Sequence, residues 1–420
     1  MRRADGMPEL LSPAGNPEKL RAAVQYGADA VYLAGKRFGM RAAADNFDLD
    51  ELQESTEFAH SHGVKIYVTL NAMPRTSEYL ALAEYVRALG EIGIDAVIVS
   101  DLGVFSLVRD VCPDMELHVS TQASAVSAQA VKAWQKLGAS RVVLARELAL
   151  SDIREIHAAA PDVELECFIH GSMCVAYSGR CLLSQYFVGR DANRGMCAQP
   201  CRWEYRTDGA RHLAFFHEVK RPEQVLTAEE YDEGTFVMSS KDLCMIEHIP
   251  ELMEAGIASF KIEGRMKSAY YTAAVTNAYR LAMDAYAADP AGYVYDPAYM
   301  RELCCVSHRE YDTGFFFGRA DGDANVTENL GYIREKAYFA TAVADTAAGE
   351  NALFVQRNKV SVGDNAELLS PGTVGRAFTV SEMYGEDMAP IDAAPHPGMK
   401  FYIKLPYPVK AGDIIRGAGS

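Results

Sequence analysis

The sequence has no apolar run long enough to span a membrane and no excess of positive charge. Its apolar runs fall short of the ~18–20 residues that a membrane helix needs, and the opening residues, MRRADGMPEL, lack the apolar core of a secretory signal. The net charge is −16, from 41 Lys and Arg against 57 Asp and Glu, which disfavours unspecific binding to nucleic acid. We expect a cytoplasmic protein without a membrane segment, in which any contact with RNA is local.

Sequence motifs of common enzyme classes are also missing. The turn after the first apolar run, within LLSPAGNPEK, has one glycine rather than GxGxxG, which disfavours a dinucleotide-binding sheet. The chain has no HExxH and no GxSxG, so it lacks the usual signatures of a zinc or serine peptidase. It has no Cys-x2-Cys pair either, although nine cysteines are present. Because disulfides are rare in a reducing cytoplasm, clustered cysteines favour a metal or redox site.

The chain does contain a regular alternation of apolar, β-rich runs with segments of helical period. Continuous apolar strands between helices predict a parallel sheet covered by helices. Eight such units favour an α/β fold of the closed (β/α)8 type, a TIM-like barrel, over an open doubly wound sheet. The eight runs are Glu9–Ser12, Ala30–Leu33, Lys65–Leu70, Ala96–Ser100, Glu116–Ser120, Arg141–Ala145, Glu164–Ile169 and Ser259–Ile262.

Two of the intervening helices have clear ends. The first covers Asn16–Tyr26, with Asn16 as N-cap and Pro17 in the first helical position, where its missing N–H loses no hydrogen bond. The second covers Asp50–His62 and ends at Gly63. Both helices follow strands, as the barrel requires.

One connection is much longer than the others. After the seventh run the next clear helix begins near Lys241, so residues 171–241 form an insertion, and long insertions are usually functional. Because it follows a strand, the insertion emerges at the C-terminal face of the barrel, where barrel active sites lie. We assign residues 1–289 to a catalytic barrel domain that includes this Cys-rich insertion.

The last part of the chain has a different pattern. Residues 290–329 are expected to form a helical and irregular connector, and residues 330–420 a small antiparallel β-barrel domain. Gly-Asp turns in SVGDNAELLSP and VKAGDIIRG precede strands, and such small barrels often bind or position ligands. The expected strands include Tyr338–Val343, Ala352–Val355, Asn365–Leu369, Ala377–Met383 and Phe401–Lys404.

Five of the nine cysteines lie between Cys167 and Cys201, in or beside the insertion. Cys174, Cys181, Cys197 and Cys201 are accompanied by small and turn-forming residues, as a backbone wrapped around an ion needs. Cys244, in SSKDLC, is expected in the first turn of a helix capped by Ser239 or Ser240, where the helix dipole favours a thiolate. Thiolates select zinc or an iron–sulfur centre, and the spacing does not choose between them. The remaining cysteines, expected to be buried or incidental, are Cys112, Cys167, Cys304 and Cys305.

These motifs resemble a known family. GSMCVAYSGRCLLSQYF and NRGMCAQPCRWEY, preceded by ELLSPAG and followed by SSKDLC and FKIEGR, look like the signatures of the collagenase-like peptidase family, class U number thirty-two. The resemblance covers essentially the whole chain. With its C-terminal module, the chain is similar to the subgroup of tRNA 5-hydroxyuridine modification proteins.

The resemblance implies a function and a cofactor. Members of that subgroup hydroxylate the wobble uridine of tRNA in a prephenate-dependent way, and relatives act on ribosomal RNA cytidine or on ubiquinone precursors. The resemblance also implies a [4Fe–4S] cluster, the anticodon region of tRNA as partner and a possible redox partner. The cluster ligands that it implies are Cys174, Cys181, Cys197 and Cys244, and the role of Cys201 stays open.

Polar side chains follow several of the predicted strands and are expected at the barrel mouth. Each alone is more simply explained as a loop residue or a salt bridge, but several cations together suit a dicarboxylate such as prephenate. Alternation would place Lys261, Glu263 and Arg265 on one side of the eighth strand. His170 is either a proton donor, a partner of the cysteines or a structural histidine. The candidate substrate-binding residues are Arg41, Asn71, Gln122, Arg146 and Arg265, and the candidate catalytic residues are His170, Lys261 and Glu263, with Glu147 also at a strand end.

Two other kinds of function remain as alternatives. The first is a peptidase with a cysteine or serine nucleophile, although no nucleophile and base can be paired from the sequence. The second is a scaffold or RNA-binding partner whose metal only stabilises the insertion.

Overall fold

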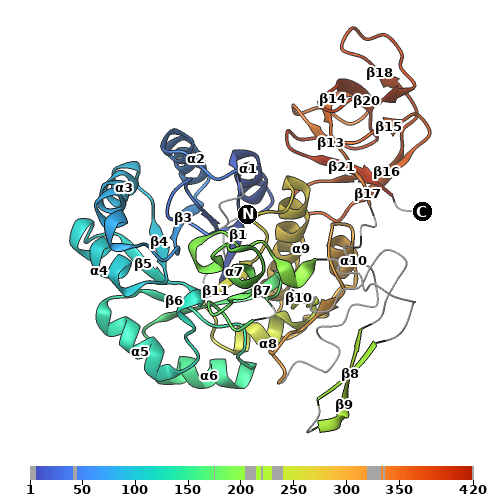
Figure 1. The fold of residues 1–420 in the computed structure, drawn as a ribbon. Coiled ribbons are helices and arrows are strands. Elements are labelled where there is room, and N and C mark those ends of the chain that lie inside the picture. The colour runs from blue at the N-terminus through green and yellow to red at the C-terminus, as the bar shows by residue number, and fades with distance from the viewer. Residues whose placement is uncertain are drawn as a thin grey trace.

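The computed structural model describes residues 6–40, 45–174, 176–203, 214–218, 221–228, 240–318, 333 and 336–418. Its larger part is a closed barrel of eight parallel strands, which Figure 1 shows along the barrel axis. The sheet closes where the last strand of the barrel pairs with both the first and the seventh. This confirms the predicted (β/α)8 barrel. Its strands are β1 (Glu9–Pro13), β2 (Ala30–Leu33), β3 (Lys65–Leu70), β4 (Ala96–Val99), β5 (Glu116–Val119), β6 (Arg141–Val143), β7 (Glu164–Ser172) and β11 (Ser259–Ile262).

Helices surround the strands as an outer ring (Figure 1). The side chain of Asn16 accepts a hydrogen bond from the backbone N–H of Lys19, so Asn16 is the predicted N-cap. The second helix begins one residue earlier than predicted because Asp48 and Glu51 form a reciprocal capping box. The helices of the ring are α1 (Pro17–Gln25), α2 (Leu49–Ser61), α3 (Tyr79–Ile92), α4 (Leu102–Val111), α5 (Ala128–Leu137), α6 (Leu150–Ala159), α8 (Ile249–Glu254) and α9 (Ala269–Ala288).

The barrel interior contains a buried network of charges. Arg141 lies 2.6 Å from Glu9 and 3.2 Å from Glu166, and Lys261 lies 2.6 Å from Glu166. Burial acts to raise the pKa of Glu166, but Lys261 and Arg141 hold it below its usual value. Tyr67 adds a 2.6 Å hydrogen bond to Glu9. The interior is therefore filled by paired charges as well as by apolar side chains.

The segment around Cys244 differs from the prediction. Asp242–Cys244 is a strand, β10, that runs antiparallel to the end of β7, and not the first turn of a helix. The strand forms because β7 continues beyond the barrel to Ser172 and offers a free edge for pairing. A 3-10 turn follows, and α8 begins only at Ile249. The helix near Lys241 and the dipole acting on Cys244 were therefore wrong predictions.

The insertion contributes short elements beside the barrel axis. In Figure 1, α7 (Leu183–Val188) is drawn over the centre of the barrel, and the hairpin of β8 (Ala214–Glu218) and β9 (Arg221–Ala228) extends away from it. Two 3-10 turns, Ala192–Arg194 and Pro200–Arg202, follow α7. Glu147, in the loop between β6 and α6, accepts hydrogen bonds from the backbone N–H and hydroxyl of Ser178. This contact fixes the cysteine segment to the barrel.

The C-terminal module is an antiparallel half-barrel with its own core. Among the described residues its main sheet is open, in the order β17-β16-β21-β13-β14-β20-β18, where a small barrel was expected. The expected run Ala377–Met383 is split between two strands. The strands of the main sheet are β13 (Tyr338–Ala342), β14 (Asn351–Gln356), β16 (Asn365–Leu369), β17 (Arg376–Thr379), β18 (Met383–Tyr384), β20 (Lys400–Lys404) and β21 (Ile414–Gly417), and β15 (Val360–Ser361) pairs with β19 (Ala393–Ala394).

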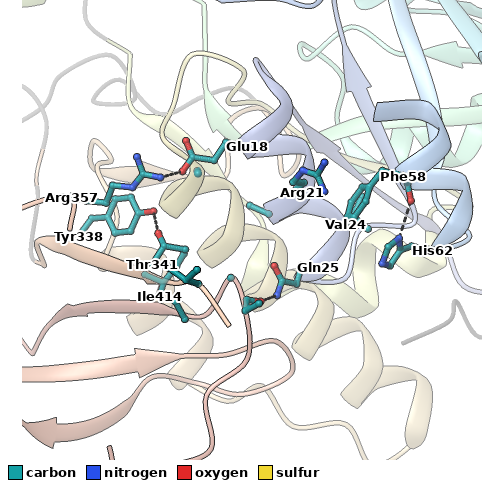
Figure 2. Close-up of a pocket in the computed structure, with 16 residues that line it drawn as sticks. Glu18, Arg21, Val24, Gln25, Phe58, His62, Tyr338, Thr341, Arg357 and Ile414 are labelled. Carbon is teal, nitrogen blue, oxygen red and sulfur yellow. Dashed lines mark hydrogen bonds and ion pairs between the residues drawn. The ribbon is translucent and has the colours of Figure 1, made fainter. Parts of the chain in front are cut away.

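Buried polar contacts fix this module against the barrel. Arg416 of β21 lies 2.6 Å from Glu302 on α10 (Ala298–Cys304), and both are buried. Asn277 of α9 donates to the carbonyl of Thr373 at 2.8 Å. Figure 2 shows the cleft along this seam, where Arg357 pairs with Glu18 of α1. The module therefore has a defined orientation relative to the barrel.

Candidate active site at the barrel mouth

A cavity of about 190 Å³ lies at the C-terminal end of the barrel strands. Residues after β3, β5, β6, β7 and β11 line it from the barrel, and the cysteine segment and α7 line it from the insertion. The structure thus brings together most of the side chains predicted at the mouth. These are Asn71, Gln122, Arg146, Lys261, Glu263 and Arg265, with Glu147, Cys174, Cys181, Cys197 and Cys201 beside them.

Lys261 lies on the floor of the cavity. Its Nζ donates to Oε1 of Glu166 at 2.6 Å and lies 4.4 Å from the ring centre of Tyr32. Burial lowers the pKa of this ammonium group, and the adjacent Glu166 opposes that effect. The lysine therefore joins the cavity to the charge network of the barrel interior.

Arg146 forms part of the wall. Its guanidinium stacks on Phe168 at 3.8 Å from the ring centre and donates to the carbonyl of Ser172 at 2.7 Å. Glu263 lies 3.7 Å from the same guanidinium. A guanidinium has five N–H donors, so these contacts orient Arg146 and leave its charge directed at the cavity.

Arg265 is the second guanidinium of the wall. It donates to Thr69 at 3.3 Å and to the carbonyl of Met40, and only 4% of it is exposed. The eighth strand ends at Ile262, so Glu263 and Arg265 lie in the following turn rather than in a continued strand. Gly171 allows this turn to approach β7, because a Cβ there would lie 2.5 Å from the carbonyl oxygen of Glu263.

Two amides of the predicted set also line the cavity. Asn71 accepts a hydrogen bond from the backbone N–H of Met40 at 3.1 Å, so it supports the loop after β2. Gln122 lies in a 3-10 turn after β5, and in the part of the chain that the structure describes its buried Oε1 has no hydrogen-bond partner. A buried acceptor without a partner is unfavourable, so Gln122 is suited to accept a bond from a ligand.

Two predicted residues are not placed in the cavity lining. Arg41 lies outside the described residues. His170 is buried behind the wall among Tyr271, Tyr279 and Tyr311, with ring-centre distances of 5.3–6.0 Å. Burial lowers the pKa of His170 to about 3, so its imidazole is neutral near pH 7. Its buried Nε2 has no hydrogen-bond partner among the described residues, and the residue lies opposite Cys244, so the three predicted alternatives stay open.

Cys244 does not join the cysteines of the cavity. It is buried on β10, opposite His170, and its Sγ lies 3.9 Å from the hydroxyl of Tyr279. Burial, the dominant cause, raises the pKa of this thiol to about 12, the reverse of the effect predicted from a helix dipole. The four cysteines that share the cavity are Cys174, Cys181, Cys197 and Cys201.

The cavity contains thiols, the usual ligands of an iron–sulfur cluster, but they are not close enough together to coordinate one. Four thiols around one cavity are the usual number and chemistry for such a cluster. Within the described ranges, however, no three Cys, His, Asp or Glu side chains lie close enough together to hold a metal ion. Of the predicted ligands, Cys174, Cys181 and Cys197 line the cavity and Cys244 does not, and the ligand set stays a prediction.

Sequence reasoning missed other residues of the lining. Thr69 lies inside the apolar run of β3, and its hydroxyl contacts Arg265. Tyr177 and Asn193 come from the insertion, and neither was among the predicted site residues. Alternation along β3 gives a weak signal for Thr69, whereas the two insertion residues follow no strand or helix period.

The fold and the site define a class: a (β/α)8 barrel with a cysteine-rich insertion over its mouth. Within the described residues no helix is long and apolar enough to cross a membrane. The model of Peptidase family U32 matches residues 15–325, and that of the Peptidase family U32 C-terminal domain matches residues 335–416. The chain belongs to peptidase family U32.

Three relatives bear on the function. The chain is 40% identical to tRNA hydroxylation protein P1 of Bacillus subtilis, over 97% of this chain and 94% of the relative. It is 36% identical to tRNA hydroxylation protein P of Escherichia coli, over 95% and 94% of the two chains. It is also 30% identical to a collagenase of Porphyromonas gingivalis, over 87% of each chain.

Proposed function

We propose that this protein hydroxylates tRNA, and that it converts wobble uridine to 5-hydroxyuridine with prephenate as co-substrate and a [4Fe–4S] cluster as cofactor. The observation that carries the proposal is the cavity itself, where guanidinium groups and four cysteines face one another at the catalytic end of a barrel. The names of the relatives from Bacillus subtilis and Escherichia coli support hydroxylation of tRNA.

The cations of the wall are suited to a small dicarboxylate. Arg146 and Arg265 are each oriented by protein contacts, and a guanidinium binds a carboxylate through two parallel hydrogen bonds. Lys261 lies at the floor, where Glu166 balances its charge. Prephenate carries two carboxylates, so it matches this arrangement better than a neutral co-substrate does.

The cysteines are the proposed ligands of the cluster, which would supply electron transfer when bound. Cys174, Cys181 and Cys197 belong to both the predicted set and the cavity lining. Either Cys201, in the cavity, or Cys244, behind it, completes four ligands. We expect protein purified without oxygen to contain about four iron and four sulfide per chain. Retention of iron in Cys201→Ala with loss in Cys244→Ala would assign Cys244, and the reverse would assign Cys201.

Proteolysis is the competing function, since one relative is named a collagenase. No histidine is present among the described residues that line the cavity, so its cysteines and serines have no imidazole base beside them. Deletion of the gene, followed by mass spectrometry of digested tRNA, tests the proposal. We expect loss of 5-hydroxyuridine and its derivatives, whereas unchanged levels in a strain without a second copy would reject hydroxylation.

A further inference from the structure

A second, larger hollow of about 850 Å³ adjoins the mouth cavity. It lies between the insertion, the turn after β11 and the first strand of the C-terminal module. Cys197 and Glu263 line both hollows, so the two share a boundary. We call this hollow the seam groove; the residues used below are Arg190, Glu263, Lys267, Lys336 and Tyr338.

The seam groove is locally cationic in a chain whose net charge is −16. Among its described lining residues, Arg190, Lys267 and Lys336 are basic and Glu263 is acidic. Lys267 donates to the carbonyl of Ser307 at 2.9 Å, which anchors the side chain at the edge of the groove. Arg190 is exposed just beyond α7. Three basic side chains therefore lie beside the entrance to the cavity, of which Lys336 is paired with Glu367.

We propose that the seam groove binds the sugar-phosphate backbone of a single-stranded RNA loop while the target base enters the mouth cavity past Cys197 and Glu263. This inference rests on the proposed tRNA hydroxylation. Enzymes that modify a base act on an unpaired nucleotide or extrude it from a helix, so the backbone needs a binding surface beside the pocket. A cationic groove next to a small cavity provides that surface.

The C-terminal module forms part of the seam groove and is held in place there. Lys336 and Tyr338, at its start, form one wall, and Lys336 is held at 2.6 Å from Glu367 of β16. The buried pair of Arg416 and Glu302 keeps this wall against the barrel. The cleft of Figure 2 is a poorer candidate, because it shares no lining residue with the mouth cavity.

Binding of an unmodified tRNA anticodon stem-loop to the full-length protein, measured at several salt concentrations, tests the groove. The double variant Arg190→Gln and Lys267→Gln removes two charges while keeping an N–H donor at each position. The matched control is Lys132→Gln with Lys136→Gln, on exposed positions of α5. Thermal unfolding of each variant verifies that the fold is kept.

We expect the groove variant to bind roughly 10-fold more weakly and to lower the slope of log affinity against log salt by roughly 1 per charge removed. The control variant should behave as the wild type. If RNA binding weakens equally in both variants, or does not change in the groove variant, the seam groove is not the RNA-binding surface. The hydroxylation proposal is not affected by either result. Absence of RNA binding by the wild-type protein overturns both.

Discussion

Charged side chains serve opposite purposes in the barrel interior and at the barrel mouth. In the interior, every carboxylate oxygen of Glu9 and Glu166 has a partner within 3.5 Å. At the mouth, Arg146 approaches Glu263 only to 3.7 Å, and the buried Oε1 of Gln122 is unpartnered within the described ranges. Paired buried charges fix the structure of the interior, whereas a buried acceptor such as Oε1 of Gln122 is suited to bind a ligand.

The same two strands supply both regions. Glu166 on β7 and Lys261 on β11 belong to the interior network, while the chain beyond each strand continues into the mouth. Stability and chemistry are therefore separated along the strand direction, as is usual in barrels of this type. Variants of the interior should therefore mainly lower the free energy of unfolding, whereas variants of the mouth should mainly lower activity.

The largest effect is expected at the mouth, in Cys197→Ala. Removal of this thiol should abolish both bound iron and tRNA hydroxylation, because the proposed cluster loses a ligand. The free energy of unfolding of the barrel should change little, since Cys197 lies in the insertion. Iron analysis and urea unfolding together measure this, with Cys112→Ala as control. Full iron in Cys197→Ala would exclude this cysteine as a ligand.

The second effect is expected in the interior, in Glu166→Gln. The change leaves Lys261 without its buried counter-charge, which typically costs about 3–5 kcal/mol, whereas Arg141 keeps its buried partner Glu9. Glu164→Gln is the matched control, because it removes a different partner of Arg141 that is 53% exposed and should cost under about 1 kcal/mol. Urea unfolding gives both values, and equal losses would show that the interior network has no special role.

Arg265→Lys should reduce hydroxylation by roughly 10-fold or more at limiting prephenate. A lysine keeps the charge but loses the guanidinium fork, and one charge-assisted hydrogen bond contributes about 1.5 kcal/mol or more. Bound iron should stay at the wild-type level. Arg154→Lys, on the exposed surface of α6, is the control. Wild-type activity in Arg265→Lys would remove Arg265 from the binding site.

The smallest expected effect is a fall in the free energy of unfolding at low pH, caused by the carboxylates of the barrel interior. Arg141 lowers the pKa of Glu9 against the effect of burial, and Lys261 and Arg141 do the same for Glu166. Their stabilisation is fully present above the usual pKa of 4.5 and is lost as the pH falls through the lower folded-state values. Each unit of lowering corresponds to about 1.4 kcal/mol. Urea midpoints from pH 7 to pH 3 should fall less steeply in Glu166→Gln, and parallel curves would contradict this assignment.

The sequence predicted the barrel well because each of its strands is buried on both faces. Runs such as Ala30–Leu33 and Ala96–Val99 are continuously apolar and stand between amphipathic helices. Strand β10 could not be predicted, because its three residues form a strand by pairing with the extension of β7 on one side and with Tyr311–Asp312 on the other. Cys244 was misplaced for that reason, since its environment is set by a tertiary contact.

The mouth was predictable where side chains follow strands directly. Asn71, Gln122 and Arg146 come after β3, β5 and β6, and all three line the cavity. His170 also lies near a strand end, but β7 continues past it and buries it against α9. How far a strand extends beyond the barrel depends on its partners, and the sequence alone does not contain that information.

The most direct test of the central claim is hydroxylation by the purified protein. Anaerobically prepared wild-type protein is incubated with tRNA from the deletion strain, with and without prephenate, and the nucleosides are analysed by mass spectrometry. The account predicts that uridine gains one oxygen atom only when prephenate is present, and that Cys197→Ala gives no product. Product formed equally without prephenate would contradict the proposed co-substrate, and no product from protein carrying its full iron and sulfide would contradict the proposed function.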